Sequence, residues 1–249
     1  MGITTEIHDG IAEVVMDNPP VNALTVAGWY EVADQVTAAG RNLDVGAVVL
    51  RAEGRGFNAG VDIKEMQATE GFDALVGANR GCHAAFKAVY ECAVPVVSAV
   101  NGYCLGGGIG LVGNSDVIVA ADDATFAIPE IDRGALGVAT HLSRLVPPLK
   151  ARAMYFTGST ATAAELAHHG SVWKVVPQAE LRDAALEVAA VIAAKDTRVM
   201  RFAKEAMNGI DLWDVNRSYR YEQGYTFEIN LLGVADEHRD KFVEKGAKG

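Results

Sequence analysis

The residues best placed to do chemistry lie in the run VSAVNGYCLGGGIGLVGNSD (97–116), where an apolar stretch leads into three consecutive glycines. Glycines that open a helix leave several backbone N–H groups without side-chain cover, and the positive end of the helix dipole lies behind them. Such N–H groups can stabilise a negative charge that develops on a substrate oxygen. We therefore interpret this run as one half of an oxyanion hole.

A second loop of the same kind is the segment FNAGVDIKEM (57–66), which precedes a predicted helix. Gly60 permits the backbone to approach a ligand closely, and the next N–H group belongs to Val61. Either loop alone is typical of an ordinary turn. Two such loops in one chain favour a pair of backbone donors that act on one oxygen.

The same glycines also fit a dinucleotide-binding pattern. Gly108, Gly110 and Gly113 match GxGxxG, the sequence that lets a pyrophosphate approach a helix N-terminus. That fold needs an acidic residue about 20 positions further on, at the end of the next strand. Here the next expected strand, 117–121, is already followed by Asp122. The spacing therefore disfavours a dinucleotide site.

A further alternative is a nucleophile elbow at Gly102–Gly106, with Cys104 in the place of the usual serine. Asp and His residues follow in the chain order of an α/β-hydrolase triad. Such a triad needs its acid and its histidine at the ends of later strands, whereas the late part of this chain is predicted to be helical. We expect Cys104 to fill space beside the glycines, and a cysteine hydrolase stays open as an alternative.

The elements that must position these loops alternate between strand and helix, which predicts an α/β fold. Strands are expected at 3–16 (a hairpin around Asp9-Gly10), 45–50, 94–100, 117–121, 125–128 and 172–176. Helices are expected from Val26, capped by Thr25, to Gly40; from Ile63, capped by Asp62; in a longer helix that ends near Cys92; and at 140–155 and 163–169. From Gln178 onward the pattern is helical almost throughout, with breaks expected at Gly224 and Gly233.

The composition excludes several classes of protein. The chain has 249 residues, half of them apolar, which suits one domain with a substantial core. Its formal charge of -10 would repel nucleic acid and anionic membranes, and no apolar run approaches the roughly 18 to 20 residues of a membrane span. The three cysteines lack CxxC spacing and the six histidines lack a ligand pattern, so no metal site is expected. The N-terminus has no signal-peptide pattern, which predicts a cytoplasmic location.

The two glycine loops, together with ATFAIPE at 124–130, resemble the enoyl-CoA hydratase/isomerase (crotonase) superfamily. The resemblance extends over essentially the whole chain. It implies an α/β fold with a crotonase-like spiral of ββα units at 1–195 and a C-terminal helical trimerisation region of the same domain at 196–249. It also implies a coenzyme A thioester as substrate, no further cofactor, and a homotrimer or homohexamer.

The resemblance assigns roles to individual residues. The oxyanion donors are the backbone N–H groups of Val61 and of Gly107, the middle glycine of its run. The residues that it implies for binding coenzyme A are Asn22, Ala23, Ala59, Gly60, Val61, Asp62 and Ile63. Lys241 and Lys245 are candidates for contact with the coenzyme A phosphates of a neighbouring subunit.

Carboxylates distinguish the reactions within this family. Members that hydrate a double bond have two glutamates, and the matching positions here are Gly110 and Glu130. With one carboxylate missing, a water molecule cannot be both held and deprotonated in the hydratase manner, so hydration is disfavoured. A double-bond isomerase that moves one proton with a single glutamate stays open.

The segment 132–146 departs from many relatives at Gly137–His141, where a Pro-Gly-x-Gly-Gly turn is common. His141 is therefore expected in a loop that lines the acyl pocket. This segment and residues 215–243 resemble a subfamily of hydrolases that open the last five-membered ring in bacterial steroid catabolism. The resemblance implies hydrolysis of a carbon–carbon bond, with Glu130 as the base and His141 orienting the water or sharing its proton.

Overall fold

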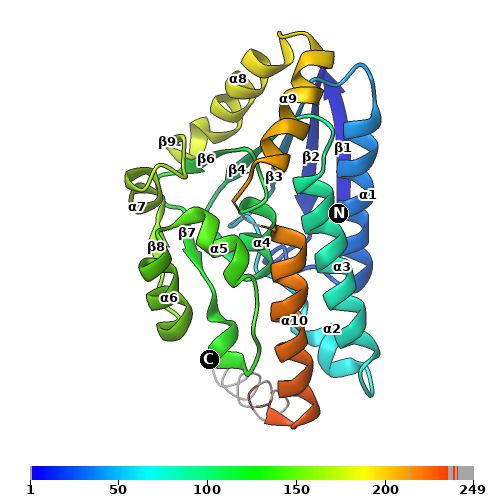
Figure 1. Cartoon of the computed structure of the whole chain (residues 1–249), viewed down its shortest axis with the longest axis vertical. Coiled ribbons are helices and arrows are strands. Elements are labelled where there is room, and N and C mark those ends of the chain that lie inside the picture. The colour runs from blue at the N-terminus through cyan, green and yellow to red at the C-terminus, as the bar shows by residue number, and fades with distance from the viewer. Residues whose placement is uncertain (1, 213, 235–237, 239, 241–249) are drawn as a thin grey trace.

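The computed structural model describes residues 2–212, 214–234, 238 and 240 (Figure 1). Its centre is a six-stranded sheet with the order β1-β2-β3-β4-β6-β9, in which β1 and β2 are antiparallel and the later neighbours are parallel. The strands are β1 (Gly2–His8), β2 (Ile11–Asp17), β3 (Ala47–Ala52), β4 (Val96–Val100), β6 (Val117–Ala121) and β9 (Lys174–Val176). This arrangement confirms the α/β class predicted from the alternating pattern.

A second, smaller sheet has the order β5-β7-β8. Its strands are β5 (Tyr103–Leu105), β7 (Thr125–Ala127) and β8 (Ala161–Thr162). The sequence predicts only a glycine-dense turn after β4, whereas the structure forms β5 there because Cys104 pairs with Phe126 of β7. The small sheet therefore carries the chain from the main sheet to the first glycine of the helix that follows.

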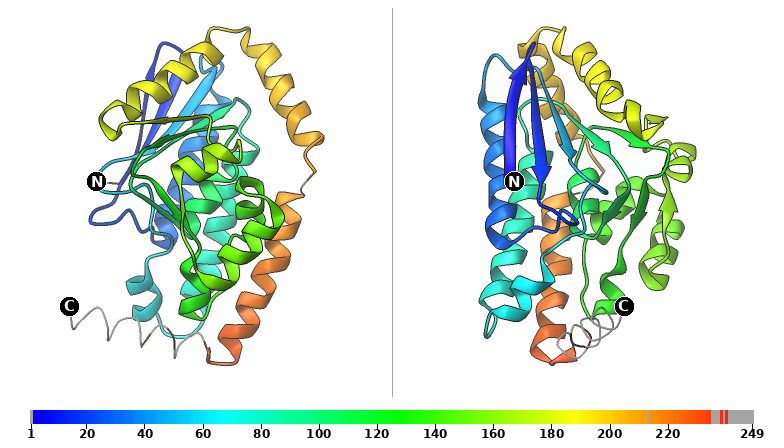
Figure 2. Two further views of the ribbon diagram at one scale, coloured as in Figure 1. Left: turned by 90° about the vertical axis from the view of Figure 1, so that its left-hand side faces the viewer. Right: turned by 180° about the vertical axis from the view of Figure 1, so that it is seen from behind.

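Helices cover both faces of the main sheet. They are α1 (Val26–Arg41), α2 (Ile63–Ala68), α3 (Asp73–Tyr90), α4 (Gly107–Val112), α5 (Ala139–Leu145), α6 (Pro148–Thr157), α7 (Ala163–His168), α8 (Leu181–Ala193), α9 (Thr197–Gly209) and α10 (Val215–Leu231), with short 3-10 helices η1 (Pro129–Arg133) and η2 (Gln178–Glu180). Figure 2 shows α10 running alongside α3, and α10 also contacts α5. None of the described helices is long and apolar enough to cross a membrane.

The two faces of the sheet bury separate cores. On one face α1 and α3 pack together, and α1 buries Trp29, Val32 and Val36 at helical spacing. On the other face α8 covers β3 and β4. The predicted caps are confirmed, since Thr25 accepts from the N–H of Gly28 at 3.1 Å and Asp62 accepts from that of Lys64 at 2.8 Å.

Two expectations about helices are wrong. The single helix expected at 140–155 is divided into α5 and α6 because Pro148 takes the first turn of a new helix. Gly224 lies inside α10, where its absent side chain faces open space and the buried residues around it keep the helix continuous. The break at Gly233 is confirmed, and its φ of 75° is a conformation that glycine adopts readily.

Candidate active site

The two glycine loops meet in the structure. Gly60, with a φ of 88°, faces the start of α4, and a Cβ atom on it would lie 3.4 Å from the nitrogen of Gly107. A Cβ atom on Gly107 would lie 3.4 Å from the Cα of Gly60 and only 2.5 Å from the ring of Trp29. We call Gly60, Val61, Gly106 and Gly107 the glycine corner, because larger residues would separate its two loops.

Backbone pairing fixes the direction in which Val61 donates. The N–H of Leu24 donates to the carbonyl of Gly60 at 2.9 Å, and the N–H of Asp62 donates to the carbonyl of Leu24 at 2.9 Å. Because successive peptide groups of an extended chain point to opposite sides, the N–H of Val61 points away from Leu24. Gly107 is the first residue of α4, so its N–H has no partner within the helix.

Both donors face one cavity. Val61 and Gly107 line a cavity of about 150 Å³ together with Glu130. In the part of the chain that the structure describes, neither N–H donates to a protein acceptor. The predicted pair of backbone donors and the predicted carboxylate therefore lie at one site, where a ligand oxygen can accept from both N–H groups.

Buried amides hold the 57–62 loop in place. Asn58 accepts from the N–H of Gly60 at 2.8 Å through Oδ1, and its Nδ2 donates to the carbonyl of Asn22 at 2.6 Å. The Nδ2 of Asn22 donates to the carbonyls of Glu53 and Gly56 at 2.7 and 2.9 Å. The Asn22 side chain is 3% exposed, and both its oxygen and its nitrogen bond to backbone groups of this network. Asn22 therefore supports the loop, and the predicted contact with coenzyme A stays a prediction.

The other residues predicted to bind coenzyme A divide into two groups. Ala59, Val61 and Ile63 line the cavity. Ala23, Gly60 and Asp62 are not among its described lining residues, and their contact with coenzyme A stays a prediction. Lys241 and Lys245 fall outside the described residues.

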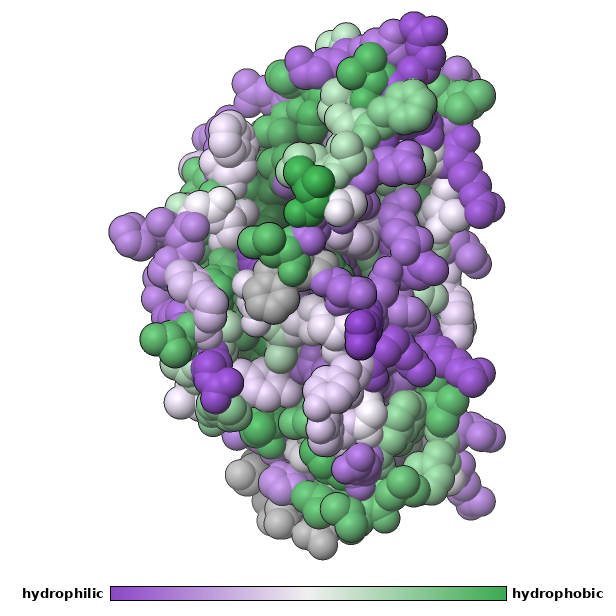
Figure 3. Space-filling view, viewed as in Figure 1, coloured by the Kyte–Doolittle hydropathy of each residue, from purple (hydrophilic) through white to green (hydrophobic). Residues whose placement is uncertain are grey.

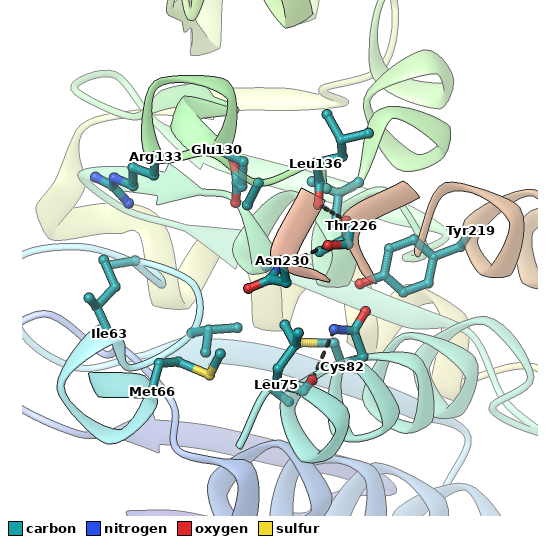
Figure 4. Close-up of a pocket in the computed structure, with 18 residues that line it drawn as sticks. Ile63, Met66, Leu75, Cys82, Glu130, Arg133, Leu136, Tyr219, Thr226 and Asn230 are labelled. Carbon is teal, nitrogen blue, oxygen red and sulfur yellow. Dashed lines mark hydrogen bonds between the residues drawn. The ribbon is translucent and has the colours of Figure 1, made fainter. Parts of the chain in front are cut away.

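The cavity is mostly apolar and lies between α10 and the elements opposite it (Figure 4). In that view Ile63, Met66 and Leu75 face Thr226 and Asn230 of α10 across the opening, and Glu130 lies on a third side. The remaining lining residues are Ala59, Val61, Ala78, Asn79, Cys82, Gly107, Arg133, Ala135, Leu136, Gly137, Val138 and Tyr219. An apolar pocket with a few polar groups suits an acyl chain that carries oxygen atoms.

Glu130 is the carboxylate of this cavity. It follows β7 on η1, and its Oε1 occupies the space that a side chain on Gly106 would need. Burial raises the pKa of Glu130 to about 7, while Arg133 opposes this change and Glu222 adds to it. Its Oε2 has no hydrogen-bond partner among the described residues. A carboxyl group with a pKa near neutrality and an unoccupied oxygen is suited to accept and return one proton.

His141 does not lie where the sequence places it. It belongs to the first turn of α5, is 1% exposed, and is absent from the described cavity lining. Its ring packs 5.0 Å from that of Phe86 and 4.9 Å from that of Tyr219, centroid to centroid. Burial lowers the pKa of His141 to about 3, so the ring is neutral. Gly137 and Val138 of the expected loop do line the cavity, whereas α5 begins at Ala139 and turns the imidazole of His141 inward.

The position of the missing second glutamate is sterically closed. A side chain on Gly110 would overlap the ring of Phe86, which is itself almost fully buried. A glutamate placed at 110 is thus not expected to restore a hydratase site unless Phe86 becomes smaller as well. The lack of this carboxylate is a property of the packing as much as of one residue.

Cys104 does not have the environment of a nucleophile. It lies in β5 with no exposed surface, and its Sγ would be 3.1 Å from a Cβ atom on Gly108. Burial raises the pKa of its thiol well above the ordinary value. A reactive thiolate needs the opposite change, so the cysteine hydrolase alternative is not supported.

The functional residues that the sequence did not predict come from α10. Tyr219, Gln223, Thr226 and Asn230 are buried polar residues at helical spacing, and three of them line the cavity. The signal was present as a polar stripe with the period of one helix face, but the sequence does not reveal which face is buried. A search of the described residues finds no group of three His, Cys, Asp or Glu side chains placed to hold a metal.

Comparisons with known proteins identify the relatives of this chain. The family described as Enoyl-CoA hydratase/isomerase matches residues 6–247. A "(7aS)-7a-methyl-1,5-dioxo-2,3,5,6,7,7a-hexahydro-1H-indene-carboxyl-CoA hydrolase" of Rhodococcus jostii is 68% identical over 99% of this chain and 96% of its own. The protein of the same name from Mycobacterium tuberculosis is 67% identical over 97% of this chain and 98% of its own. A solved enoyl-CoA hydratase/isomerase of Xanthobacter autotrophicus superposes with a TM-score of 0.85 at 28% identity, covering 92% of this chain and 87% of its own.

Proposed function

The chain belongs to the enoyl-CoA hydratase/isomerase family, and we propose that it opens the five-membered ring of a methyl-dioxo-hexahydroindene-carboxyl-CoA thioester by hydrolysis. The observation that carries this proposal is the identity of 68% and 67% to two hydrolases named for that thioester, over nearly the whole length of each. The cavity supports it, since Glu130 and two backbone N–H groups without an acceptor among the described residues line an apolar pocket.

We propose that Glu130 starts the reaction by taking a proton from water, whose oxygen adds to the carbon of the ring ketone. The tetrahedral adduct then collapses with cleavage of the bond between that carbon and its ring neighbour. The former ketone carbon becomes a carboxylate, and the electron pair of the broken bond stays on the neighbour. Glu130 returns its proton to the carbon framework, so that one water is consumed overall.

The carbanion is the high-energy intermediate of this reaction, and the glycine corner can stabilise its charge. A conjugated double bond in the substrate carries the negative charge to the thioester oxygen, where the N–H groups of Val61 and Gly107 can donate to it. Removing one donor of an oxyanion hole typically lowers the rate by about 10²–10³-fold. In this proposal Glu130 and the two N–H groups contact the reacting atoms. Neutral His141 packs against the ring of Tyr219, which lines the cavity.

Oxygen-18 water tests the reaction class. The protein is incubated with the bicyclic diketone thioester and, in parallel, with a straight-chain trans-enoyl-CoA, and the products are weighed by mass spectrometry. Label in a new carboxylate of the ring-opened product is expected, with little or no hydration of the straight-chain substrate. Label in a β-hydroxyl group would contradict the proposal.

A double-bond isomerase is the second candidate, because the cavity holds one family carboxylate, Glu130, and position 110 is closed. Its signature in the same experiment is a shifted double bond with no label from water. That result would replace hydrolysis as the assigned reaction.

We further propose a homotrimer or homohexamer in the cytoplasm. The outer side of α9 exposes Phe202 and Met207, and the segment after it exposes Ile210 and Leu212, the latter at 97%. Figure 3 shows further apolar side chains on this face of the molecule, with a group at its lower end where α10 finishes. Several large apolar side chains exposed on one helix and the segment after it suit a protein–protein interface. Light scattering coupled to size-exclusion chromatography tests it, and a monomeric mass would contradict it.

A further inference from the structure

The wall of the cavity opposite the glycine corner contains a strained residue. Val138 has a φ of 51°, which is unusual for a β-branched side chain, and it lines the cavity beside Gly137. A Cβ atom on Gly137 would lie 3.3 Å from the Cγ of Glu130, so this backbone packs directly against the proposed base. A strained backbone conformation persists only where neighbouring groups hold it, so contacts next to Val138 must stabilise its conformation.

Glu222 of α10 is one of these groups. Its Oε1 accepts from the N–H of Ala139 at 2.9 Å and from the hydroxyl of Tyr155 at 3.2 Å. The nearby N–H of Thr140 lowers the pKa of this carboxyl group as well. Glu222 therefore holds the first turn of α5, immediately after Val138, in one position.

The charge of Glu222 reaches the proposed base. Its Oε2 is buried and has no hydrogen-bond partner among the described residues. Burial raises the pKa of Glu222, whereas the N–H groups of Ala139 and Thr140 and the hydroxyl of Tyr155 lower it. The N–H of Ala139 and the hydroxyl of Tyr155 stabilise the ionised form of Glu222, and its negative charge raises the pKa of Glu130.

The other titratable groups around this pair do not replace Glu222 in that role. Arg133, on the same 3-10 helix as Glu130, lowers the pKa of Glu130. Burial raises the pKa values of Tyr155, Tyr219 and Cys82, so these three groups are neutral at the pH where Glu130 titrates. In the described part of the site, Glu222 is thus the anion that opposes ionisation of Glu130.

We infer that Glu222 is a positioning residue with two effects on Glu130. It holds the Gly137–Ala139 segment against Glu130, and it places a negative charge near the carboxyl group that gains and loses the proton. This inference rests on the proposed function, in which Glu130 is the base. Under this inference α10 influences proton transfer through Glu222 in addition to lining the cavity.

Two conservative variants separate the two parts of this role. Glu222→Gln keeps an oxygen that can accept from the N–H of Ala139 and removes the charge. Glu222→Asp keeps the charge and is one methylene too short to reach the same N–H without movement of the backbone. Glu228→Gln removes a charge from the exposed side of the same helix and serves as the control.

The measurement is the pH profile of kcat and of kcat/KM with the bicyclic diketone thioester. For Glu222→Gln we expect the acid limb of kcat/KM to move to lower pH, with the plateau kcat within about threefold of the original protein. For Glu222→Asp we expect the limb to stay and the plateau kcat to fall about tenfold or more, with a smaller change in KM, because displaced catalytic groups lose rate. Glu228→Gln should change neither.

Direct titration gives a second readout. With carboxyl-carbon-13 glutamate, the resonance of Glu130 should titrate at lower pH in Glu222→Gln than in the unmodified protein. An unchanged titration and an unchanged acid limb would overturn the inference. If Glu130→Gln abolishes turnover at the same time, only the role of Glu222 fails. If Glu130→Gln keeps turnover, the proposed base fails and the role of Glu222 fails with it.

Discussion

The glycine corner and the wall opposite it form one cavity by different means. The corner presents backbone N–H groups, which two short segments supply and which buried amides of Asn22 and Asn58 hold in place. The wall, which we define as Gly137, Val138, Tyr219, Thr226 and Asn230, presents side chains and a strained backbone from two distant parts of the chain. The first joins two loops that each carry a recognisable glycine motif, and the second depends on how α10 packs.

This difference suggests that the corner serves a step common to the whole family, whereas the wall serves the choice of substrate by one member. Backbone donors can stabilise charge on any thioester oxygen and do not recognise the acyl group. The polar residues of α10 line the same cavity with side chains, which can distinguish one acyl group from another. We therefore expect changes in the corner to lower the rate with every substrate, and changes in the wall to alter the choice among substrates.

Glu130, which lies between the two regions, should give the largest effect. Glu130→Gln is nearly isosteric and cannot take a proton, so we expect kcat to fall about 10²–10⁴-fold with the binding of coenzyme A thioester unchanged. In the unmodified protein kcat/KM should rise tenfold per pH unit below about pH 7 and level off above it, because the carboxylate is the active form.

Steady-state kinetics and calorimetric binding check this prediction. Glu187→Gln, which removes an exposed carboxylate paired with Lys174 at 2.9 Å, is the matched control and should leave both quantities in place. Turnover of Glu130→Gln within a few-fold of the original would remove Glu130 from the mechanism.

Gly107→Ala tests the corner. The new Cβ atom would meet the ring of Trp29 at 2.5 Å, so α4 must move and carry its first N–H away from the cavity. We expect kcat to fall about 10²–10³-fold for ring-opening and for any other thioester reaction of the protein. Gly224→Ala, in an open position of α10, is the control and should be neutral or slightly stabilising. Equal activity of both variants would contradict an N–H donor at Gly107.

Thr226→Val tests the wall with a smaller change. The hydroxyl of Thr226 donates to the carbonyl of Leu136 at 2.8 Å and ties α10 to the segment before α5. We expect a loss of about 1 kcal/mol in the free energy of unfolding and a several-fold fall in kcat/KM for the bicyclic substrate. Thr157→Val removes a hydroxyl that bonds within α6 on the exposed surface and should leave kcat/KM unchanged. A rate loss shared equally by Thr157→Val would show that the effect is not specific to the wall.

Cys104→Ala should give the smallest change, because the thiol lies outside the cavity. We expect activity within about threefold and a loss of roughly 1 kcal/mol in unfolding free energy from the removed sulfur. Cys92→Ala, another fully internal thiol, should behave in the same way. Inactivation by Cys104→Ala alone, with the fold retained, would favour the cysteine hydrolase.

The sequence predicts the corner well and the wall poorly, for a physical reason. The glycines of the two loops and the cap at Asp62 form motifs that the sequence reveals directly, although distant Leu24 fixes the direction of the Val61 N–H. The places of His141 and Glu222 depend on the rotation of α5 and α10 about their axes, which is decided by packing between distant helices. Glu130 is intermediate, since its motif predicts the residue and only the structure shows that burial raises its pKa.

The ring of Phe86 behind Gly110 also bears on how such a protein can change during evolution. A glutamate at 110 alone would overlap the ring, and overpacking of a core costs about 1–3 kcal/mol or more. Shrinking Phe86 alone would leave a cavity at a cost of about 3–5 kcal/mol. A domain has only about 5–15 kcal/mol of stability in total. Either substitution made first would therefore remove a sizeable part of the free energy of unfolding before the second could restore it. Conversion to a two-glutamate hydratase would thus need a coupled exchange at positions 86 and 110, because a substitution at either position alone lowers the stability of the fold.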